Sequence, residues 1–157
     1  MRKKSLIIAA LILIIDQLIK IMVAKEFSYG TLKTIIPNFF YLTKVYNDGA
    51  AWSIFSGSIA FLVILAIVAL IFLLNYEKSF ISNKKNIMAF GLVYGGLLGN
   101  LIDRVMYNYV IDYIKLVFGN YHFPIFNFAD MSIVIGVLLI FWAIIRGEEK
   151  NESRSKK

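Results

Sequence analysis

The sequence contains no cysteine and only one histidine, His122, among its 157 residues. Without a thiol, the chain can form neither a disulfide nor a thiolate nucleophile. Zinc sites in proteins take most of their ligands from cysteine and histidine, so we expect no site of that kind. Any catalysis must therefore use other side chains, and we expect it to need neither a metal ion nor a cofactor.

Charge is scarce in long stretches of the chain, and 59% of its residues are hydrophobic. Soluble domains are about 45–50% apolar, and a membrane-spanning helix needs about 20 mostly apolar residues. Apolar segments at 6–24, 58–76, 87–104 and 130–146 approach that length. We therefore predict one integral membrane domain over residues 1–157, of the all-α class. It would have four transmembrane helices with a small extracytoplasmic β-sheet and loop region.

The lysines and arginines predict the orientation of this domain. They are concentrated near both termini and in the connection 77–86, and an excess of positive charge marks the cytoplasmic side of a membrane protein. The termini, including the tail 147–157, are then cytoplasmic, and the connections 25–57 and 105–129 lie outside. Strand-like pieces at 34–36, 40–46 and 109–118 predict the sheet. Because the net charge of +7 is explained by topology, we expect no nucleic-acid partner.

The aspartates are placed unevenly, since none lies in a segment assigned to the cytoplasm. Asp16 and Lys20 are four residues apart, so they share a helix face and predict an ion pair directed into the bundle. At about 1.5 Å per residue, Asp16 would lie near the middle of the membrane, apart from the other aspartates. Intramembrane charges are candidates for function. Whether this pair is structural or functional is open from the sequence.

The segment 87–104 combines a glycine repeat with a polar end. Gly91, Gly95 and Gly99 recur every four residues, a spacing that allows another helix to approach closely. Asn100, Asp103 and Arg104 follow at the outer end. Adjacent residues of a helix do not face one another, so Asp103 and Arg104 should have separate partners. One hypothesis is a bidentate pair of the arginine with a carboxylate, and the other is that these residues only mark the helix end at the lipid headgroups.

Asp112 and Asp130 are the strongest catalytic candidates. Asp112 stands among apolar residues in VIDYI, which is atypical of a solvated carboxylate. Asp130 opens the last apolar segment, where Asn127 or Asp130 itself would cap the helix. Two carboxylates held close together cannot both ionise easily, so they share a proton. One then accepts a proton from water while the other donates to a substrate carbonyl, as in aspartic proteases.

Three alternatives compete with this interpretation. A serine–lysine hydrolase would use Ser53, Ser56, Ser58 or Ser132 with Lys20 or Lys44, although neither a GxSxG nor an SxxK pattern occurs. A small proton-coupled membrane transporter would use intramembrane carboxylates, and it would show acids across the whole membrane depth and an internal repeat. A purely structural membrane protein would use its polar residues only for helix packing.

The chain resembles the bacterial prolipoprotein signal peptidases, also called signal peptidase II. Five short motifs carry the resemblance in order along the chain: DQLIK (16–20), YNDGAAWSIF (46–55), GNLIDRV (99–105), VIDYI (110–114) and FNFAD (126–130). It implies an intramembrane aspartic endopeptidase that cuts the signal peptide from a precursor just before its diacylglyceryl-modified cysteine. Ser53 stands where related enzymes usually carry glycine, which affects only local loop geometry.

The resemblance also implies roles for individual residues. The catalytic pair falls on Asp112 and Asp130. The supporting or substrate-binding residues fall on Asp16, Lys20, Asn47, Gly49, Asn100, Asp103, Arg104 and Asn127. It implies membrane lipids and lipidated prolipoproteins as partners, a multi-pass location in the bacterial inner membrane with the active site near the outer face, and inhibition by cyclic peptide antibiotics. We expect a monomer.

Overall fold

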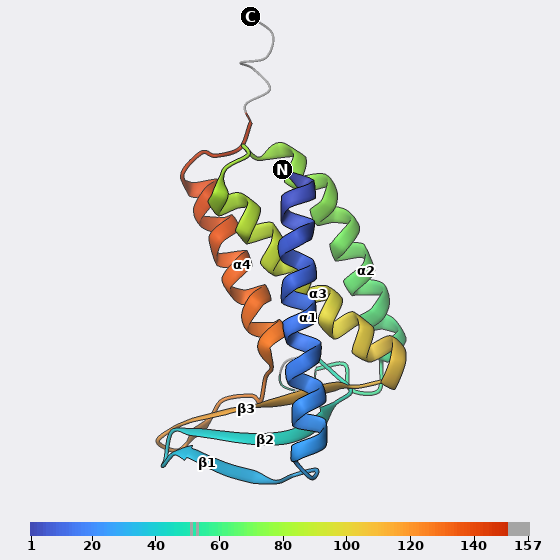
Figure 1. The fold of residues 1–157 in the computed structure, drawn as a ribbon, viewed down its shortest axis with the longest axis vertical. Helices are drawn as coiled ribbons and strands as arrows, with labels where there is room; N and C mark the ends of the chain where they lie inside the picture. The colour runs from blue at the N-terminus through green and yellow to red at the C-terminus, as the bar shows by residue number, and fades with distance from the viewer. Residues whose placement is uncertain (51, 53, 151–157) are drawn as a thin grey trace, which may run out of the picture.

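The computed structural model describes residues 1–50, 52 and 54–150, so Ala51 and Ser53 lie outside the described residues. The elements follow in the order α1 (Arg2–Glu26), β1 (Leu32–Ile36), β2 (Phe40–Asn47), α2 (Ile59–Tyr76), the short 3₁₀ helix η2 (Glu77–Ser79), α3 (Lys84–Tyr107), β3 (Val110–Phe118), β4 (Tyr121–His122) and α4 (Phe128–Ile145). Figure 1 shows the long helices side by side in a bundle, with the strands across one end and the N-terminus at the other.

Three of the described helices are long and apolar enough to cross a membrane: Arg2–Glu26, Ile59–Ser79 and Phe128–Ile145. Large apolar side chains such as Leu11, Val68 and Leu138 are more than half exposed on them, as expected for surfaces that face lipid. These helices indicate a membrane protein. The helix α3 is absent from this group because glycines and polar residues interrupt its apolar sequence. A fourth span therefore stays a prediction.

The helix α3 is the centre of the bundle and packs mainly against α1 and α4. A Cβ atom built on Gly95 would lie 2.5 Å from Ile12 Cβ and 2.8 Å from the Ala9 carbonyl oxygen, and one built on Gly91 would lie 2.6 Å from Ile8 Cβ. On its other side, Gly96 contacts the backbone of Ala129 in α4. The prediction that the glycine repeat serves close helix packing is confirmed, and both helices it admits belong to this chain.

The strands form one antiparallel sheet in the order β1–β2–β3–β4. The strands predicted at 34–36, 40–46 and 109–118 are all present, with ends shifted by one or two residues. In the pairing of β2 with β3, Val45 lies opposite Asp112 and Asn47 opposite Val110, after a bulge between Leu42 and Val45. This register brings the end of β2 beside the aspartate of β3.

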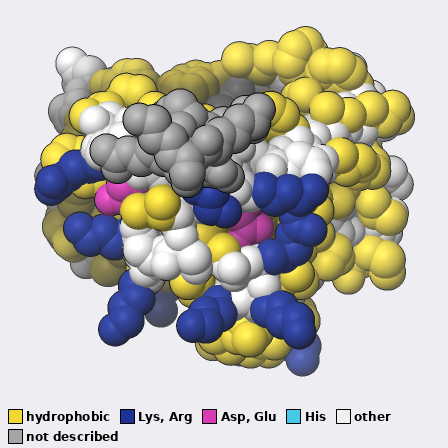
Figure 2. Space-filling view, turned by 90° about the horizontal axis from the view of Figure 1, so that it is seen from above, with side chains coloured by type: hydrophobic (Ala, Val, Ile, Leu, Met, Phe, Trp, Pro, Cys, Tyr) yellow, Lys and Arg dark blue, Asp and Glu magenta, His cyan; other side chains and the backbone are white. Residues whose placement is uncertain are grey.

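The opposite end of the bundle contains a buried carboxylate that the sequence did not single out. Glu77, at the end of α2, is only 2% exposed. It accepts a hydrogen bond of 2.6 Å from the hydroxyl of Ser5 and one of 3.1 Å from the hydroxyl of Tyr94. These bonds tie α1 and α3 to the end of α2. Around this end, Figure 2 shows lysine and arginine side chains spread over the surface.

The glycine packing generates a test. We expect Gly95→Ala to destabilise the protein by about 1–3 kcal/mol, because the new methyl group overlaps Ile12 and a backbone oxygen and overpacking costs that much. Thermal unfolding in detergent measures the loss. The control is Ala10→Val, which adds a larger group on the exposed face of α1. Equal unfolding midpoints for Gly95→Ala and the unchanged protein would contradict the packing argument.

Candidate active site

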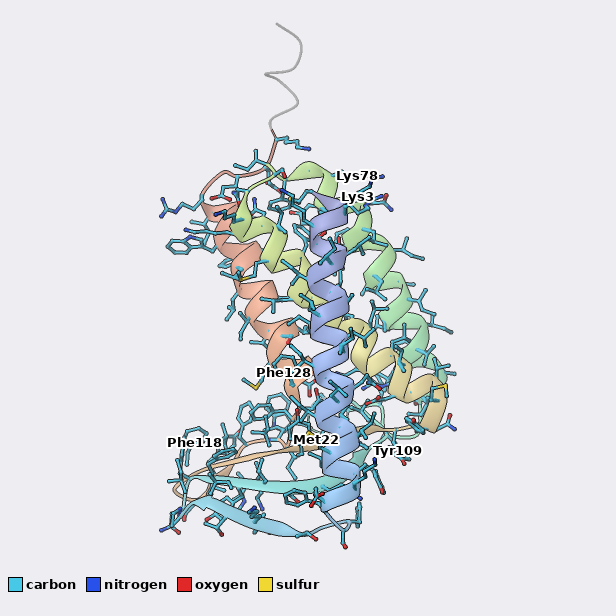
Figure 3. The ribbon with its side chains drawn as sticks, viewed as in Figure 1. Lys3, Met22, Lys78, Tyr109, Phe118 and Phe128 are labelled. Carbon is cyan, nitrogen blue, oxygen red and sulfur yellow. The ribbon has the colours of Figure 1, made fainter. Side chains whose placement is uncertain are left out.

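A cluster of buried and partly buried polar side chains lies where the bundle meets the sheet. Its members are Asp16 and Lys20 from α1, Asn100 and Asp103 from α3, Asp112 from β3, and Asn127 with Asp130 at the start of α4. Asp112 is 2% exposed and Asn127 is fully buried. In Figure 3 the label of Phe128 marks this level, between the helices and the strands. The structure thus gathers seven of the sequence-predicted site residues.

Asn127 is the N-cap of α4, which confirms that prediction. Its side-chain oxygen accepts a 3.0 Å hydrogen bond from the backbone N–H of Asp130, and a carboxylate oxygen of Asp130 accepts a 3.1 Å bond from the backbone N–H of Asn127. This reciprocal capping box satisfies two backbone donors that the helix leaves open. It also holds the Asp130 carboxylate in the first turn, where the helix dipole favours negative charge.

Asp112 approaches the same residue from the sheet. The chain before α4 runs beside β3, because Phe126 exchanges backbone hydrogen bonds with Ile114. Asn127 therefore comes level with Asp112, and its side-chain nitrogen donates a 2.7 Å hydrogen bond to Asp112 Oδ1. The two aspartates, far apart in the sequence, are both bound to Asn127.

Neutral amides occupy the remaining carboxylate oxygens. Asn47 donates a 2.8 Å bond to Asp112 Oδ2, and Asn100 donates a 2.7 Å bond to Asp130 Oδ1. Within the part of the chain that the structure describes, neither aspartate forms a salt bridge. Burial first, and then the nearby charge of Asp130, raise the pKa of Asp112, and the amide bonds act in the opposite direction; the net result is a pKa of about 7. Asp112 can therefore hold or release a proton near neutral pH.

Lys20 forms the charged layer behind the two aspartates. Its ammonium group lies 2.7 Å from Asp16 Oδ2, 2.8 Å from Asp103 Oδ2 and 3.0 Å from Asn100 Oδ1. The predicted ion pair with Asp16 is confirmed, but the expectation that Asp16 stands apart from the other aspartates is wrong. Because α1 continues to Glu26, its middle lies level with the end of α3 and the start of α4. Asp16 Oδ1 accepts a 3.1 Å bond from the N–H of Ala129 there.

Gln17 also belongs to this layer, and the sequence analysis missed it. Its amide donates 2.9 Å to Asp103 Oδ1 and 3.3 Å to the Gly99 carbonyl oxygen. Adjacent helix residues point in different directions, yet both Asp16 and Gln17 contact α3. Its polarity within the apolar stretch 6–24 was the available signal.

Arg104 contacts a backbone carbonyl, so the hypothesis of a bidentate carboxylate pair is wrong. Its Nη2 donates a 2.8 Å bond to the Gly49 oxygen, and the Gly49 N–H donates 2.9 Å to the side chain of Asn47. The arginine leaves the end of α3 toward the chain that follows β2, which explains why it reaches no site carboxylate. It fixes the turn that holds Asn47 against Asp112.

The serine–lysine hypothesis finds no support among the described residues. Lys20 is held by two carboxylates, and Lys44 donates 2.8 Å to the Ala24 carbonyl oxygen. The hydroxyl of Ser132 donates to the Phe128 carbonyl, and that of Ser56 donates to Asp48. Ser53 lies outside the described residues. In the described ranges, no three His, Asp or Glu side chains are grouped to hold a metal ion.

Comparisons with known proteins match this chain to one family of bacterial enzymes. Residues 8–146 match the family described as signal peptidase (SPase) II. The lipoprotein signal peptidase of Staphylococcus haemolyticus (strain JCSC1435) is 43% identical over 149 residues, which cover 94% of each protein. That of Bacillus pumilus (strain SAFR-032) is 39% identical, covering 94% of this chain and 96% of the relative. A bacterial membrane enzyme solved by the in meso method at 2.3 Å superposes with a TM-score of 0.81 at 38% identity, covering 98% of this chain and 91% of the other.

Removal of the Lys20 charge tests the buried layer. We expect Lys20→Met to cost about 3–5 kcal/mol of stability, because two buried carboxylates lose their counter-charge. Unfolding in detergent at neutral pH measures the loss. Lys25→Met, at an exposed position of the same helix, is the control and should change stability little.

A further variant separates charge from packing in that experiment. Adding Asp16→Asn and Asp103→Asn to Lys20→Met removes all three charges, so much of the lost stability should return. A triple variant as unstable as Lys20→Met alone would contradict the electrostatic explanation.

Proposed function

The chain belongs to the signal peptidase II family, and from this membership we propose that it is an aspartic endopeptidase that cuts prolipoproteins just before the lipid-modified cysteine. Members of the family are peptidases that remove the signal peptide of prolipoproteins. The observation that carries the aspartic mechanism is the binding of Asp112 and Asp130 to one buried residue, Asn127. A carboxylate pair of this kind can hydrolyse a peptide with water alone.

In the proposed reaction the two carboxyl groups have opposite roles. Asp130, held in the first turn of α4, is ionised and takes a proton from the attacking water. Asp112 is protonated and gives its proton to the oxygen of the scissile carbonyl as the water oxygen bonds to its carbon. When the tetrahedral intermediate collapses, the carbon–nitrogen bond breaks and the leaving amine takes the proton held by Asp130. At the same time one hydroxyl of the intermediate becomes the new carbonyl and returns its proton to Asp112. One water is consumed, and the carboxyl protons return to their starting distribution.

The other family-implied residues are proposed to position this pair. Asn47 and Asn100 orient the carboxylates through their amides. Arg104 holds Gly49 and hence the turn that contains Asn47. A substrate backbone bound beside this turn would lie along the end of β2, next to Asp112.

The membrane placement is proposed on the same basis. The helices α1, α2 and α4 would span the bilayer with α3 as a fourth, shielded span, both termini on the cytoplasmic side and the sheet outside. Supporting this orientation, the N-terminus and the end of α4 lie at the bundle end away from the sheet (Figure 1). The site then lies at the outer boundary of the inner membrane, where signal helix and acyl chains of a lipidated precursor meet water. A monomer that binds cyclic peptide antibiotics at this site fits the proposal.

The transporter alternative loses support from the position of Asp16. A carrier would distribute its acids through the membrane, whereas Asp16 joins Asp103 and Asp130 at one level through Lys20 and Asn100.

The catalytic proposal is tested with Asp112→Asn and Asp130→Asn. We expect each variant to lower cleavage of a lipidated precursor at least about 1,000-fold, because an amide can neither accept the proton of water nor return one. Release of the signal peptide by purified protein in detergent is the readout. Asp48→Asn, an exposed aspartate beside the site, is the matched control. Cleavage at the normal rate by either site variant would refute the pair.

The pH profile tests which aspartate holds the proton. Asp112 must be protonated to act as the acid, so kcat/KM should fall as pH rises above about 7. The Asn47 amide stabilises the ionised form of Asp112, so Asn47→Ala raises that pKa and should move the alkaline limb to higher pH. The exposed residue Asn120, changed to alanine, is the control. An alkaline limb that stays in place or moves downward in Asn47→Ala would contradict the assignment.

A further inference from the structure

A hollow lies at the end of the bundle away from the carboxylates. It is an open groove of about 430 Å³ between the beginning of α3 and the end of α4. Its lining residues are Lys84, Lys85, Met88, Leu139 and Trp142. Met88 is 51% exposed and Trp142 49% exposed, so the groove wall is apolar surface open to the surroundings. We call it the α3–α4 groove.

Positive charge stands at the mouth of the α3–α4 groove. Lys84 and Lys85 are both exposed. The guanidinium of Arg146 lies over the Trp142 ring at 5.2 Å from its centre, which keeps a third positive charge beside the groove. Within the described ranges, none of these three residues forms a salt bridge. Glu148, the described acid nearest to Arg146 along the chain, instead accepts a 2.6 Å hydrogen bond from the side chain of Asn83.

We propose that the α3–α4 groove binds one anionic phospholipid. An acyl chain would lie along Met88, Leu139 and Trp142, and the phosphate would lie between the lysines and Arg146. An apolar cleft between helices with a basic rim is the arrangement that recognises acidic headgroups. A zwitterionic lipid carries its own cation and gains less from this rim.

This inference is independent of the proposed peptidase activity, because the groove and the catalytic pair lie at opposite ends of the bundle. Asp112→Asn should therefore bind the lipid as well as the unchanged protein does. Lipid binding without cleavage would support the groove and count against the peptidase. Cleavage without lipid binding would support the peptidase and count against the groove.

Trp142 provides a direct probe of the groove. The chain has two tryptophans, so Trp52→Phe leaves Trp142 as the only one. This protein is placed in phosphatidylcholine vesicles that contain a small fraction of either dibrominated phosphatidylglycerol or dibrominated phosphatidylcholine. Bromine quenches the fluorescence of a tryptophan that it contacts. We expect stronger quenching by the anionic lipid, corresponding to about 10-fold or greater preference over the zwitterionic lipid.

Two charge variants make the test specific to the groove. Lys84→Gln with Lys85→Gln should remove most of the preference, since each lysine near the headgroups contributes about a fivefold factor, or about 25-fold for the pair. The control, Lys3→Gln with Lys78→Gln, removes the same charge from exposed positions at the same end of the bundle (Figure 3). Equal quenching by the two lipids would overturn the proposal. An equal loss in the control pair would also overturn it, because the effect would then be general surface charge.

Discussion

The ammonium of Lys20 is the contact on which the rest of the site depends. It lies within 3.0 Å of three oxygens, from Asp16, Asp103 and Asn100. With its Oδ1 turned to Lys20, Asn100 presents its NH₂ group to Asp130. Asn127 gives one N–H to the same Asn100 oxygen and the other to Asp112. The orientation of both amides, and of both carboxylates, follows from one buried charge.

The Lys20 charge does not contact Asp112 or Asp130 directly, and this separation has a chemical consequence. Asp103 contacts the Lys20 ammonium directly, whereas Asp112 receives hydrogen bonds only from neutral amides. An ammonium in direct contact would favour the ionised form strongly. With an asparagine layer between, burial prevails and raises the pKa of Asp112 to about 7. The layered arrangement fixes the geometry of the pair and still leaves Asp112 able to carry a proton.

The sequence predicted those features that depend on local spacing. The four-residue separation of Asp16 and Lys20, the cap at Asn127 and the strand at 109–118 are readable from neighbours in the chain. Contacts between distant elements were not readable. The pairing of Arg104 with Gly49 depends on where β2 ends, and that depends on a bulge without a clear sequence signal. The position of Asp16 relative to the other aspartates depends on the full length of α1, Arg2–Glu26. That helix is longer than the apolar stretch 6–24 that the sequence showed.

Helix packing and site chemistry meet at Gly99. A side chain there would overlap the carboxylate of Asp16 and approach Ala129 in α4, so the bare backbone allows α1, α3 and α4 to converge on one point. Only then can Asp16 reach the N–H of Ala129 while Lys20 spans to Asp103. The same glycines make α3 less hydrophobic than its neighbours. Because other helices cover α3, its interior surface is free to hold polar groups.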